Sequence, residues 1–439
     1  MAAPAQLDSP GLVSRGLAER YSAVRGWTEK LAEGLSPEDQ MVQSCFEASP
    51  VKWHRAHTSW FFETFLLAPH LAGYCAVDER FRYLFNSYYD HVGERPERGT
   101  RGMISRPDAA EIAVYRRRVD EAMQQLLLGD GRPEIAQLVE LGLNHEQQHQ
   151  ELMVTDIKHA FWTNPLRPAY WATRETAANS TAAAAEWLEF EGGVAEAGHG
   201  GEGFAFDNER PRHRVLLNDF LLGGRLVTNG EYMQFMADGG YATPTLWLSE
   251  GWEAVRTNRW QAPLYWEERD GKWFCFTCGG MRELDADEPV SHVSLFEADA
   301  YARWRGARLA TEFEWEHAAA RESEAAARGN LLEREHLHPA PACGSAQFFG
   351  DCWEWTSSSY GPYPGFRPAA GALGEYNGKF MCNQYVLRGG SCATPQSHIR
   401  PSYRNFFPAV TRWQFSGIRL AKDGGSSAGA AEARTRGRA

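Results

Sequence analysis

Apolar residues recur every three or four positions from the start of the 439-residue chain to about residue 165. This spacing places them on one face of a helix and predicts amphipathic segments. The four predicted helices cover residues 12–35, 50–67, 108–128 and 133–164. Helices of this length joined by loops, some of them long, predict an up-down four-helix bundle.

The pattern changes at about residue 182, where glycine becomes dense and short alternating runs replace the long helical ones. The runs 213–217 and 385–388 predict short strands. Helical spacing returns at 229–238, 295–305 and 312–321, and Thr311 has the character of an N-cap for the last of these. The chain is therefore predicted to be an all-α domain followed by an α+β domain. The predicted boundaries are 1–180 and 181–423, with 424–439 as a disordered Gly/Ala/Ser/Arg-rich tail.

The composition of the chain excludes some classes of function. A hydrophobic content of 43% with 13% aromatic residues indicates a globular protein with ample core material. The net charge of −12 argues against a nucleic-acid partner, and no apolar run is long enough to predict a membrane span. The first residues lack a secretory signal, so a cytoplasmic location is expected, with the eight cysteines as reduced thiols.

His145 and His149 are the most informative pair of residues. They lie four positions apart on the inward stripe of the predicted helix 133–164, so both imidazoles can point at one spot. That geometry is half of a transition-metal site. Two core histidines that hydrogen-bond to neighbours are the plainer alternative. Glu151 follows His149 by two residues, about 200° round the helix, which favours a supporting or structural role over ligation.

The predicted helix 50–67 offers a third ligand. Ser49 has the character of an N-cap before Pro50. His57 lies in the middle of the apolar face of this helix, whereas His54 lies nearer its edge and is expected to be a surface or supporting group. Three neutral imidazoles in a bundle core would hold a divalent metal and leave coordination positions open.

These residues and several later motifs resemble a known family. The later motifs occupy 203–214, 303–315, 351–356, 386–391 and 417–420. The N-terminal half resembles the DinB-like metal-binding bundle, and the C-terminal half resembles the formylglycine-generating-enzyme (sulfatase-modifying) fold, a relative of C-type lectins. In this order the two modules are similar to the ergothioneine-biosynthesis sulfoxide synthases, over about residues 12 to 423.

The resemblance implies a mononuclear non-heme iron(II) oxidoreductase that uses O2. It assigns the iron ligands to His57, His145 and His149, and a contact with the substrate imidazole to Gln148. The implied substrate is hercynine, the Nα-trimethyl derivative of histidine. Sulfur is joined to its imidazole C2, and the product is a sulfoxide.

An aromatic segment near the C-terminus is implied to line the substrate pocket. It matches Asn405, Phe406 and Phe407. Aromatic faces suit a quaternary ammonium group because it carries no N–H, and Trp413 would add a further face. Without the resemblance, a Phe-Phe-Pro run is more often part of a core.

The same resemblance implies a tyrosine as proton donor, matching Tyr88 or Tyr89, and an arginine that holds the carboxylate of the thiol donor, matching Arg98. One position departs from the family pattern. The family carries an aspartate that holds the amino group of a cysteine donor, and Glu47 stands there instead. The selenoneine synthases, a related branch, use a selenosugar without an amino-acid head group. Cysteine or gamma-glutamylcysteine and a selenosugar therefore remain alternative donors.

Two other classes of function compete with this interpretation. A DinB-type bundle could hold zinc and serve a thiol transferase or hydrolase. The lectin-like half could belong to a non-catalytic binding protein, although such a protein has no need of the inward pair His145 and His149.

Overall fold

The computed structural model describes residues 10–129, 131–171, 181–322, 329–344, 347–369 and 371–424. Contacts divide the chain into two compact units. The first comprises Met1–Trp171 and Ala369–Tyr376, and the second comprises Ala172–Pro368 and Asn377–Ala439. The predicted disordered tail lies, apart from Gly424, outside the described residues.

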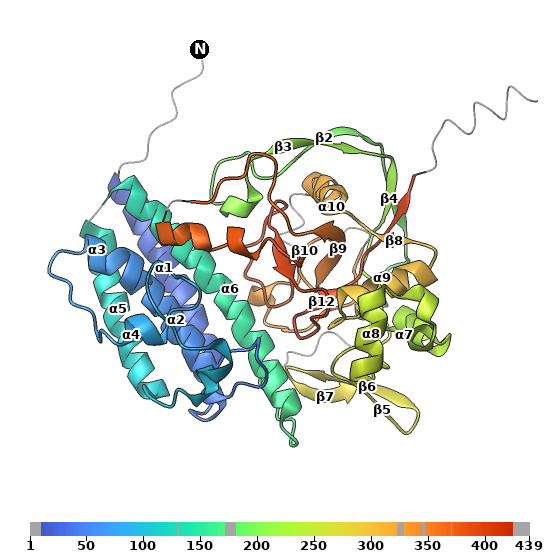
Figure 1. Ribbon diagram of the computed structural model, residues 1–439, viewed down its shortest axis with the longest axis horizontal. Coiled ribbons are helices and arrows are strands. Elements are labelled where there is room, and N and C mark those ends of the chain that lie inside the picture. The colour runs from blue at the N-terminus through green and yellow to red at the C-terminus, as the bar shows by residue number, and fades with distance from the viewer. Residues whose placement is uncertain are drawn as a thin grey trace, which may run out of the picture. The chain divides into compact units, whose positions relative to one another are not determined.

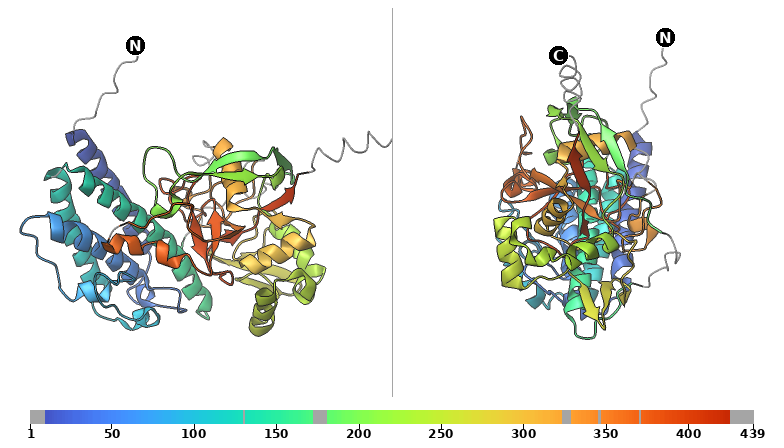
Figure 2. Two further views of the ribbon diagram at one scale, coloured as in Figure 1. Left: turned by 45° about the horizontal axis from the view of Figure 1, so that its top comes forward. Right: turned by 90° about the vertical axis from the view of Figure 1, so that its right-hand side faces the viewer.

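The first unit is helical. Its elements are α1 (Pro10–Glu33), η1 (Asp39–Met41), α2 (Val51–Phe62), η2 (Glu63–Leu67), α3 (Ala68–His70), α4 (Phe81–Leu84), η3 (Arg98–Met103), α5 (Ala109–Gly129), α6 (Pro133–Thr163) and η9 (Gly371–Glu375). The long helices α1, α2, α5 and α6 pack side by side, drawn from blue to teal in Figure 1 and Figure 2. All four helices predicted from periodicity are therefore present, with boundaries within about two residues except at the end of the second, where the α-helix stops at Phe62.

The predicted helix 50–67 is divided in the structure. Its first part is α2, and its last five residues form the π-helical turn η2. The predicted N-cap was wrong, because Pro50 occupies that position without a side-chain cap. Ser49 is instead held from outside the helix. Its backbone N–H donates to Asp156 at 2.8 Å, and its hydroxyl accepts from Arg101 at 2.9 Å.

Gly142 sets the spacing between α2 and α6. A Cβ atom on this residue would lie 2.5 Å from Cε1 of Phe62 and 3.0 Å from Cε1 of Phe61. Only a residue without a side chain lets the two helices approach this closely. Because Gly142 lies one turn before His145, the close approach brings that histidine up to α2.

The second unit combines short helices with short strands. Its helices and helical turns are η4 (Asp207–Glu209), α7 (Asn229–Ala237), η5 (Gly240–Ala242), η6 (Pro244–Leu246), α8 (Ser249–Asn258), α9 (Leu295–Trp304), α10 (Glu312–Ala319), η8 (Leu332–Arg334) and η10 (Gly378–Phe380). Its strands are β1 (Trp187–Phe190), β2 (Gly193–Ala197), β3 (His213–Leu217), β4 (Phe220–Gly223), β5 (Trp266–Arg269), β6 (Lys272–Thr277), β7 (Gly280–Glu283), β8 (Arg308–Leu309), β9 (Trp353–Ser359), β10 (Tyr385–Arg388), β11 (Asn405–Phe407), β12 (Ser416–Gly417) and β13 (Leu420–Asp423).

The strands form small, mostly antiparallel sheets. Two sheets have four strands, in the orders β1-β4-β13-β8 and β11-β10-β9-β12. Strands β2 and β3 form a two-stranded sheet, and β5-β6-β7 form a three-stranded one. Strand β12 runs parallel to β9. The predicted strands 213–217 and 385–388 correspond to β3 and β10. The predicted N-cap of α10 is confirmed, since the hydroxyl of Thr311 accepts from the backbone N–H of Glu314.

The fold is thus α plus β, as predicted. All eight cysteines are free thiols. Within the described part of the chain, no helix is both long enough and apolar enough to cross a bilayer.

Candidate metal centre

Three imidazoles from two helices of the first unit point at one place. His57 comes from α2, and His145 and His149 come from α6 one turn apart. Each offers one ring nitrogen, and these atoms all lie within 4.8 Å of one another. The exposed fractions of the three residues are 0%, 1% and 9%, so water does not compete freely for the nitrogens.

The hydrogen bonds of His57 fix which of its nitrogens faces the centre. Its Nδ1 lies 2.6 Å from the carbonyl oxygen of Phe85, which can only accept, so Nδ1 carries the proton. Its Nε2 then presents a lone pair 3.2 Å from Nε2 of His145. A proton could satisfy this pair of nitrogens, but His149 brings a third to the same place. A divalent cation satisfies all three, so the donor set fits a transition metal.

Burial keeps these imidazoles neutral, which is the form that ligates a metal. It lowers the pKa of His57 and of His149 well below the usual range, and it lowers the pKa of His145 to about 3. The imidazoles close to one another add to the lowering for His57 and His149, since two positive charges at this distance would repel.

Aromatic rings hold the plane of His57. The Trp53 indole is nearly parallel to the imidazole at an interplanar angle of 11°, with ring centroids 4.7 Å apart. Trp60 is nearly parallel to it as well, at 17° and 5.3 Å. The buried guanidinium of Arg101 lies 3.5 Å from the centroid of Trp53. The ring therefore has little freedom to turn away from the centre.

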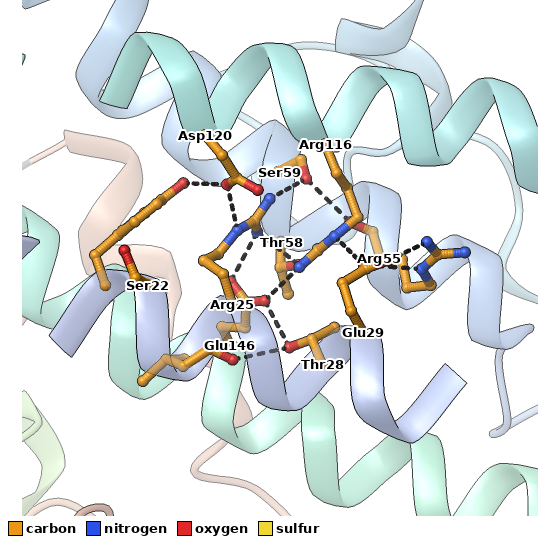
Figure 3. A network of polar contacts seen from close by, with 12 residues as sticks. Ser22, Arg25, Thr28, Glu29, Arg55, Thr58, Ser59, Arg116, Asp120 and Glu146 are labelled. Carbon is orange, nitrogen blue, oxygen red and sulfur yellow. Dashed lines mark hydrogen bonds and ion pairs between the residues drawn. The ribbon is translucent and has the colours of Figure 1, made fainter. Parts of the chain in front are cut away.

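A buried ionic network joins the four long helices and includes the residue that follows His145 in the sequence (Figure 3). Glu146, which follows His145 on α6, accepts from Arg25 of α1 at 2.8 Å and from Arg116 of α5 at 3.0 Å. The hydroxyl of Thr28 donates to the same carboxylate at 2.6 Å. Despite full burial, these partners lower the pKa of Glu146 to about 2. The network orients the turn of α6 that carries His145.

The network extends to α2 through side chains labelled in Figure 3. Arg25 also donates to Asp120 of α5 at 2.7 Å and to the Ser59 hydroxyl of α2 at 2.7 Å. Arg116 donates to the backbone carbonyl of Arg55 at 2.8 Å. The sequence analysis did not assign these groups. In the sequence, such groups are marked only by charged residues at positions where the apolar spacing predicts the inward face of a helix.

His54 was expected to be a surface or supporting group, and its burial excludes the first of these two alternatives. The residue is only 2% exposed. Its Nδ1 lies 2.7 Å from Nδ1 of His149, and its Nε2 lies 3.1 Å from Oδ2 of Asp156. His54 is thus a buried neighbour of the candidate centre. Glu151 lies outside the group of three imidazoles.

Tyr376 is a residue of this unit that the sequence analysis missed. It is 7% exposed, and its ring centroid lies 5.6 Å from that of His145. Its hydroxyl donates to Oε1 of Gln148, the half-buried residue next to His149. Tyr88 is also near it, with ring centroids 6.1 Å apart. Tyr89 is fully buried and stacks on Tyr88 at 4.6 Å.

Arg98 and Glu47 lie side by side on the first unit. Both residues are exposed, and the Arg98 guanidinium donates to the backbone carbonyl of Glu47. The carboxylate of Glu47 is not the group that holds the arginine.

The aromatic residues predicted near the C-terminus lie in the second unit. Asn405, Phe406 and Phe407 form the edge strand β11. Phe406 stacks on Tyr360 at 4.0 Å, whereas Phe407 meets Trp413 edge-on at 5.6 Å. Successive side chains of a strand point to opposite faces, so the two phenylalanines belong to different aromatic groups.

Comparison with known proteins adds the family context. The family model described as "Sulfatase-modifying factor enzyme 1-like domain" matches residues 173–338 and 335–424. A formylglycine-generating enzyme of Streptomyces coelicolor is 30% identical over 234 residues, which are 44% of this chain and 73% of that protein.

Two other relatives carry names from ergothioneine metabolism. A hercynine oxygenase of Mycobacterium tuberculosis is 40% identical over 242 residues, which are 50% of this chain and 56% of the relative. The ergothioneine biosynthesis protein 1 of Schizosaccharomyces pombe is 30% identical over 232 residues, which are 50% of this chain and 28% of the relative. The matched region thus spans about half or less of these two relatives. The predicted resemblance to this group of proteins is confirmed.

Proposed function

The chain belongs to the sulfatase-modifying factor enzyme 1-like family, and from that premise we propose that it is an iron(II)- and O2-dependent oxygenase acting on hercynine. The observation that carries the proposal is the convergence of His57, His145 and His149, whose ring nitrogens lie within 4.8 Å of one another. The names of the relatives supply the substrate class. We assign the helical unit to the DinB-like metal-binding bundles.

The proposed reaction joins hercynine to a thiol or selenol. One C–S or C–Se bond forms at imidazole C2, and the sulfur or selenium gains one oxygen atom. O2 accepts four electrons, and its second oxygen atom leaves as water with the hydrogens of the thiol and of C2. When bound, iron(II) supplies the redox chemistry that activates O2.

The residues of the chain position the metal and move protons. The three neutral imidazoles leave the full double charge on a bound divalent ion, which favours the deprotonated thiol of the donor. Gln148 and Tyr376 share a hydrogen bond one residue from His149. Gln148 is proposed to contact the substrate imidazole. The phenol Oη of Tyr376 is proposed to donate the proton needed for water to leave.

The sequence predicted Tyr88 or Tyr89 as the proton donor, and Tyr376 is proposed in their place. Tyr88 and Tyr89 stack on one another, and Tyr89 packs against Trp60 and Phe65. The hydroxyl of Tyr376 donates to Gln148, and its ring centroid lies 5.6 Å from that of His145.

The remaining substrate contacts are proposed from the resemblance. Phe407 and Trp413, which form one aromatic pair, suit the trimethylammonium group. Phe406 belongs to the group around Tyr360 on the other face of β11, and Asn405 shares the face of Phe407. The exposed guanidinium of Arg98 is proposed to bind the carboxylate of an amino-acid donor.

Oxygen uptake by the iron(II)-loaded protein tests the proposal. Hercynine together with a donor is expected to start O2 consumption, and mass spectrometry is expected to find the sulfoxide or selenoxide conjugate. A panel of cysteine, gamma-glutamylcysteine and a selenosugar separates the donor classes, because Glu47 suits the first two less well than the family's aspartate. Zinc-dependent thiol transfer without O2 uptake would contradict the proposal, and so would hercynine binding without turnover.

A further inference from the structure

His54 lies between a buried carboxylate and one of the proposed metal ligands. Its Nε2 contacts Oδ2 of Asp156 at 3.1 Å, and its Nδ1 contacts Nδ1 of His149 at 2.7 Å. The three side chains are 2%, 4% and 9% exposed, in the order His54, Asp156, His149. Both contacts have hydrogen-bond lengths, so the residues form one continuous chain shielded from water.

The carboxylate of Asp156 decides which atom donates in each of these two hydrogen bonds. Asp156 is a carboxylate and can only accept, so Nε2 of His54 carries the proton and donates it. A neutral imidazole carries one N–H, so with the proton on Nε2 the Nδ1 atom of His54 presents a lone pair. Nδ1 of His149 must then donate to that lone pair. The remaining nitrogen of His149, Nε2, is therefore left with a lone pair, in the form that a metal binds.

The carboxylate itself is held in place. Oδ2 of Asp156 also accepts from the backbone N–H of Ser49 at 2.8 Å, at the residue just before α2 begins. The same oxygen thus receives two donors from the start of α2, one from the backbone and one from His54. This arrangement ties the start of α2 to Asp156, which lies two turns beyond His149 on α6.

We infer that His54 is a positioning residue, oriented by Asp156, that fixes the tautomer and ring direction of His149 so that its Nε2 faces the metal. The inference rests on the proposed three-histidine metal centre and goes beyond it. The corresponding role for His57 is filled by the backbone carbonyl of Phe85, which accepts from Nδ1. The two ligands are therefore held by different means: His57 of α2 donates to the backbone oxygen of Phe85 at the end of α4, and His149 of α6 donates to a side-chain relay through His54 of α2.

Metal affinity, measured without turnover, distinguishes whether His54 positions His149 or only fills space in the core. His54→Phe keeps a ring of similar volume and removes both hydrogen bonds. Anaerobic titration of the metal-free protein with Co(II) or Fe(II) is expected to show a dissociation constant about 10–100-fold weaker than that of the wild type. The visible absorption spectrum of bound Co(II) is expected to change as well, because the ligand geometry changes.

The matched control is His159→Phe. This histidine also lies on α6, is half-buried, and contacts the Ser44 hydroxyl at 2.7 Å. Its substitution is expected to leave the dissociation constant and the Co(II) spectrum unchanged. Equal affinities and spectra for His54→Phe and the wild type would overturn the inference. Absence of metal binding by the wild type would instead overturn the metal centre itself.

A measurement on the wild type avoids any loss of folding in a variant. In protein labelled with 15N on the histidine rings, the metal-free state is expected to show His149 protonated at Nδ1 and His54 at Nε2. The His149 signals are identified by their absence in His149→Ala. A proton on Nε2 of His149 would contradict the inference, whatever the variants do.

Discussion

Nε2 of His57 and Nε2 of His145 face one another at 3.2 Å, although the two residues stand on different helices and 88 positions apart in the chain. The contact depends on the close approach of α2 and α6, and on the rings that hold the plane of His57. With His149 one turn further along α6, this relationship defines the candidate centre.

The spacing of the two helices predicts the effect of Gly142→Ala. The new methyl group would lie 2.5 Å from the Phe62 ring, so the core must shift at a cost of about 1–3 kcal/mol. This cost outweighs the gain of up to about 1 kcal/mol in helix propensity. Thermal unfolding is expected to show a lower midpoint for the variant.

Gly26→Ala is the control for this prediction. Gly26 lies exposed on α1, and a Cβ atom there would have no neighbour within 4 Å. Its substitution is expected to stabilise the protein by about 0.5–1 kcal/mol. Stabilisation by both substitutions would show that α6 does not pack tightly on Phe62.

The buried network around Glu146 predicts a large loss of stability in Glu146→Ala. Arg25 and Arg116 would lose the carboxylate that they share in the interior. Removal of one partner from a buried ion pair costs about 3–5 kcal/mol. Chemical denaturation measures the loss.

Glu140→Ala provides the exposed comparison on the same helix. Glu140 pairs with Arg20 at 3.1 Å, and the side chains of Arg20 and Glu140 are 53% and 30% exposed. Such a pair contributes at most about 1 kcal/mol. Similar losses in the two variants would mean that Glu146 is not held as an ion in the interior.

Tyr376→Phe removes the phenol hydroxyl and is expected to change the product of the reaction. Without this proton donor, formation of the conjugate is expected to fall by about 100-fold or more, and oxidation of the donor alone is expected to rise. Product analysis by mass spectrometry measures the ratio. Tyr88→Phe is the control, because the Tyr88 ring lies 6.1 Å from that of Tyr376 and the substitution leaves the Tyr376–Gln148 hydrogen bond in place. An unchanged ratio in Tyr376→Phe would remove this tyrosine from the mechanism.

The elements of the first unit could be predicted because their periodicity is regular. The same reasoning could not choose between a surface and a supporting role for His54, since all twelve residues of α2 are buried and the helix has no solvent face against which an edge can be defined. The N-cap at Ser49 failed for a related reason. Its polar groups are taken by Asp156 and Arg101, which are 107 and 52 positions away.

Tyr376 could not be found from local pattern either. It lies 228 positions from Gln148, in the short segment of the C-terminal half that belongs to the helical unit. Only a three-dimensional arrangement connects the two. The pairing of Thr311 with α10, by contrast, is local, because a cap acts over three residues, and it was predicted correctly.

The carboxyl of Asp351 predicts a pH dependence of stability in the second unit. Burial raises its pKa from 3.8 to about 6. Because the pKa is raised in the folded state, the protonated Asp351 carboxyl makes its full contribution to stability below pH 3.8. That contribution is lost as the pH rises through about 6. Relative to Asp351→Asn, the wild type is expected to gain about 2 kcal/mol between pH 7.5 and pH 4.5. Parallel pH profiles for the two proteins would refute the assignment.

Iron content after anaerobic reconstitution and removal of unbound metal tests the central claim most directly. The wild type is expected to retain a single iron(II) ion per chain. His57→Ala, His145→Ala and His149→Ala are each expected to retain almost none, while circular dichroism shows the helical content of the wild type. Full iron retention by any of the three folded variants, or none by the wild type, would contradict a centre built from these imidazoles.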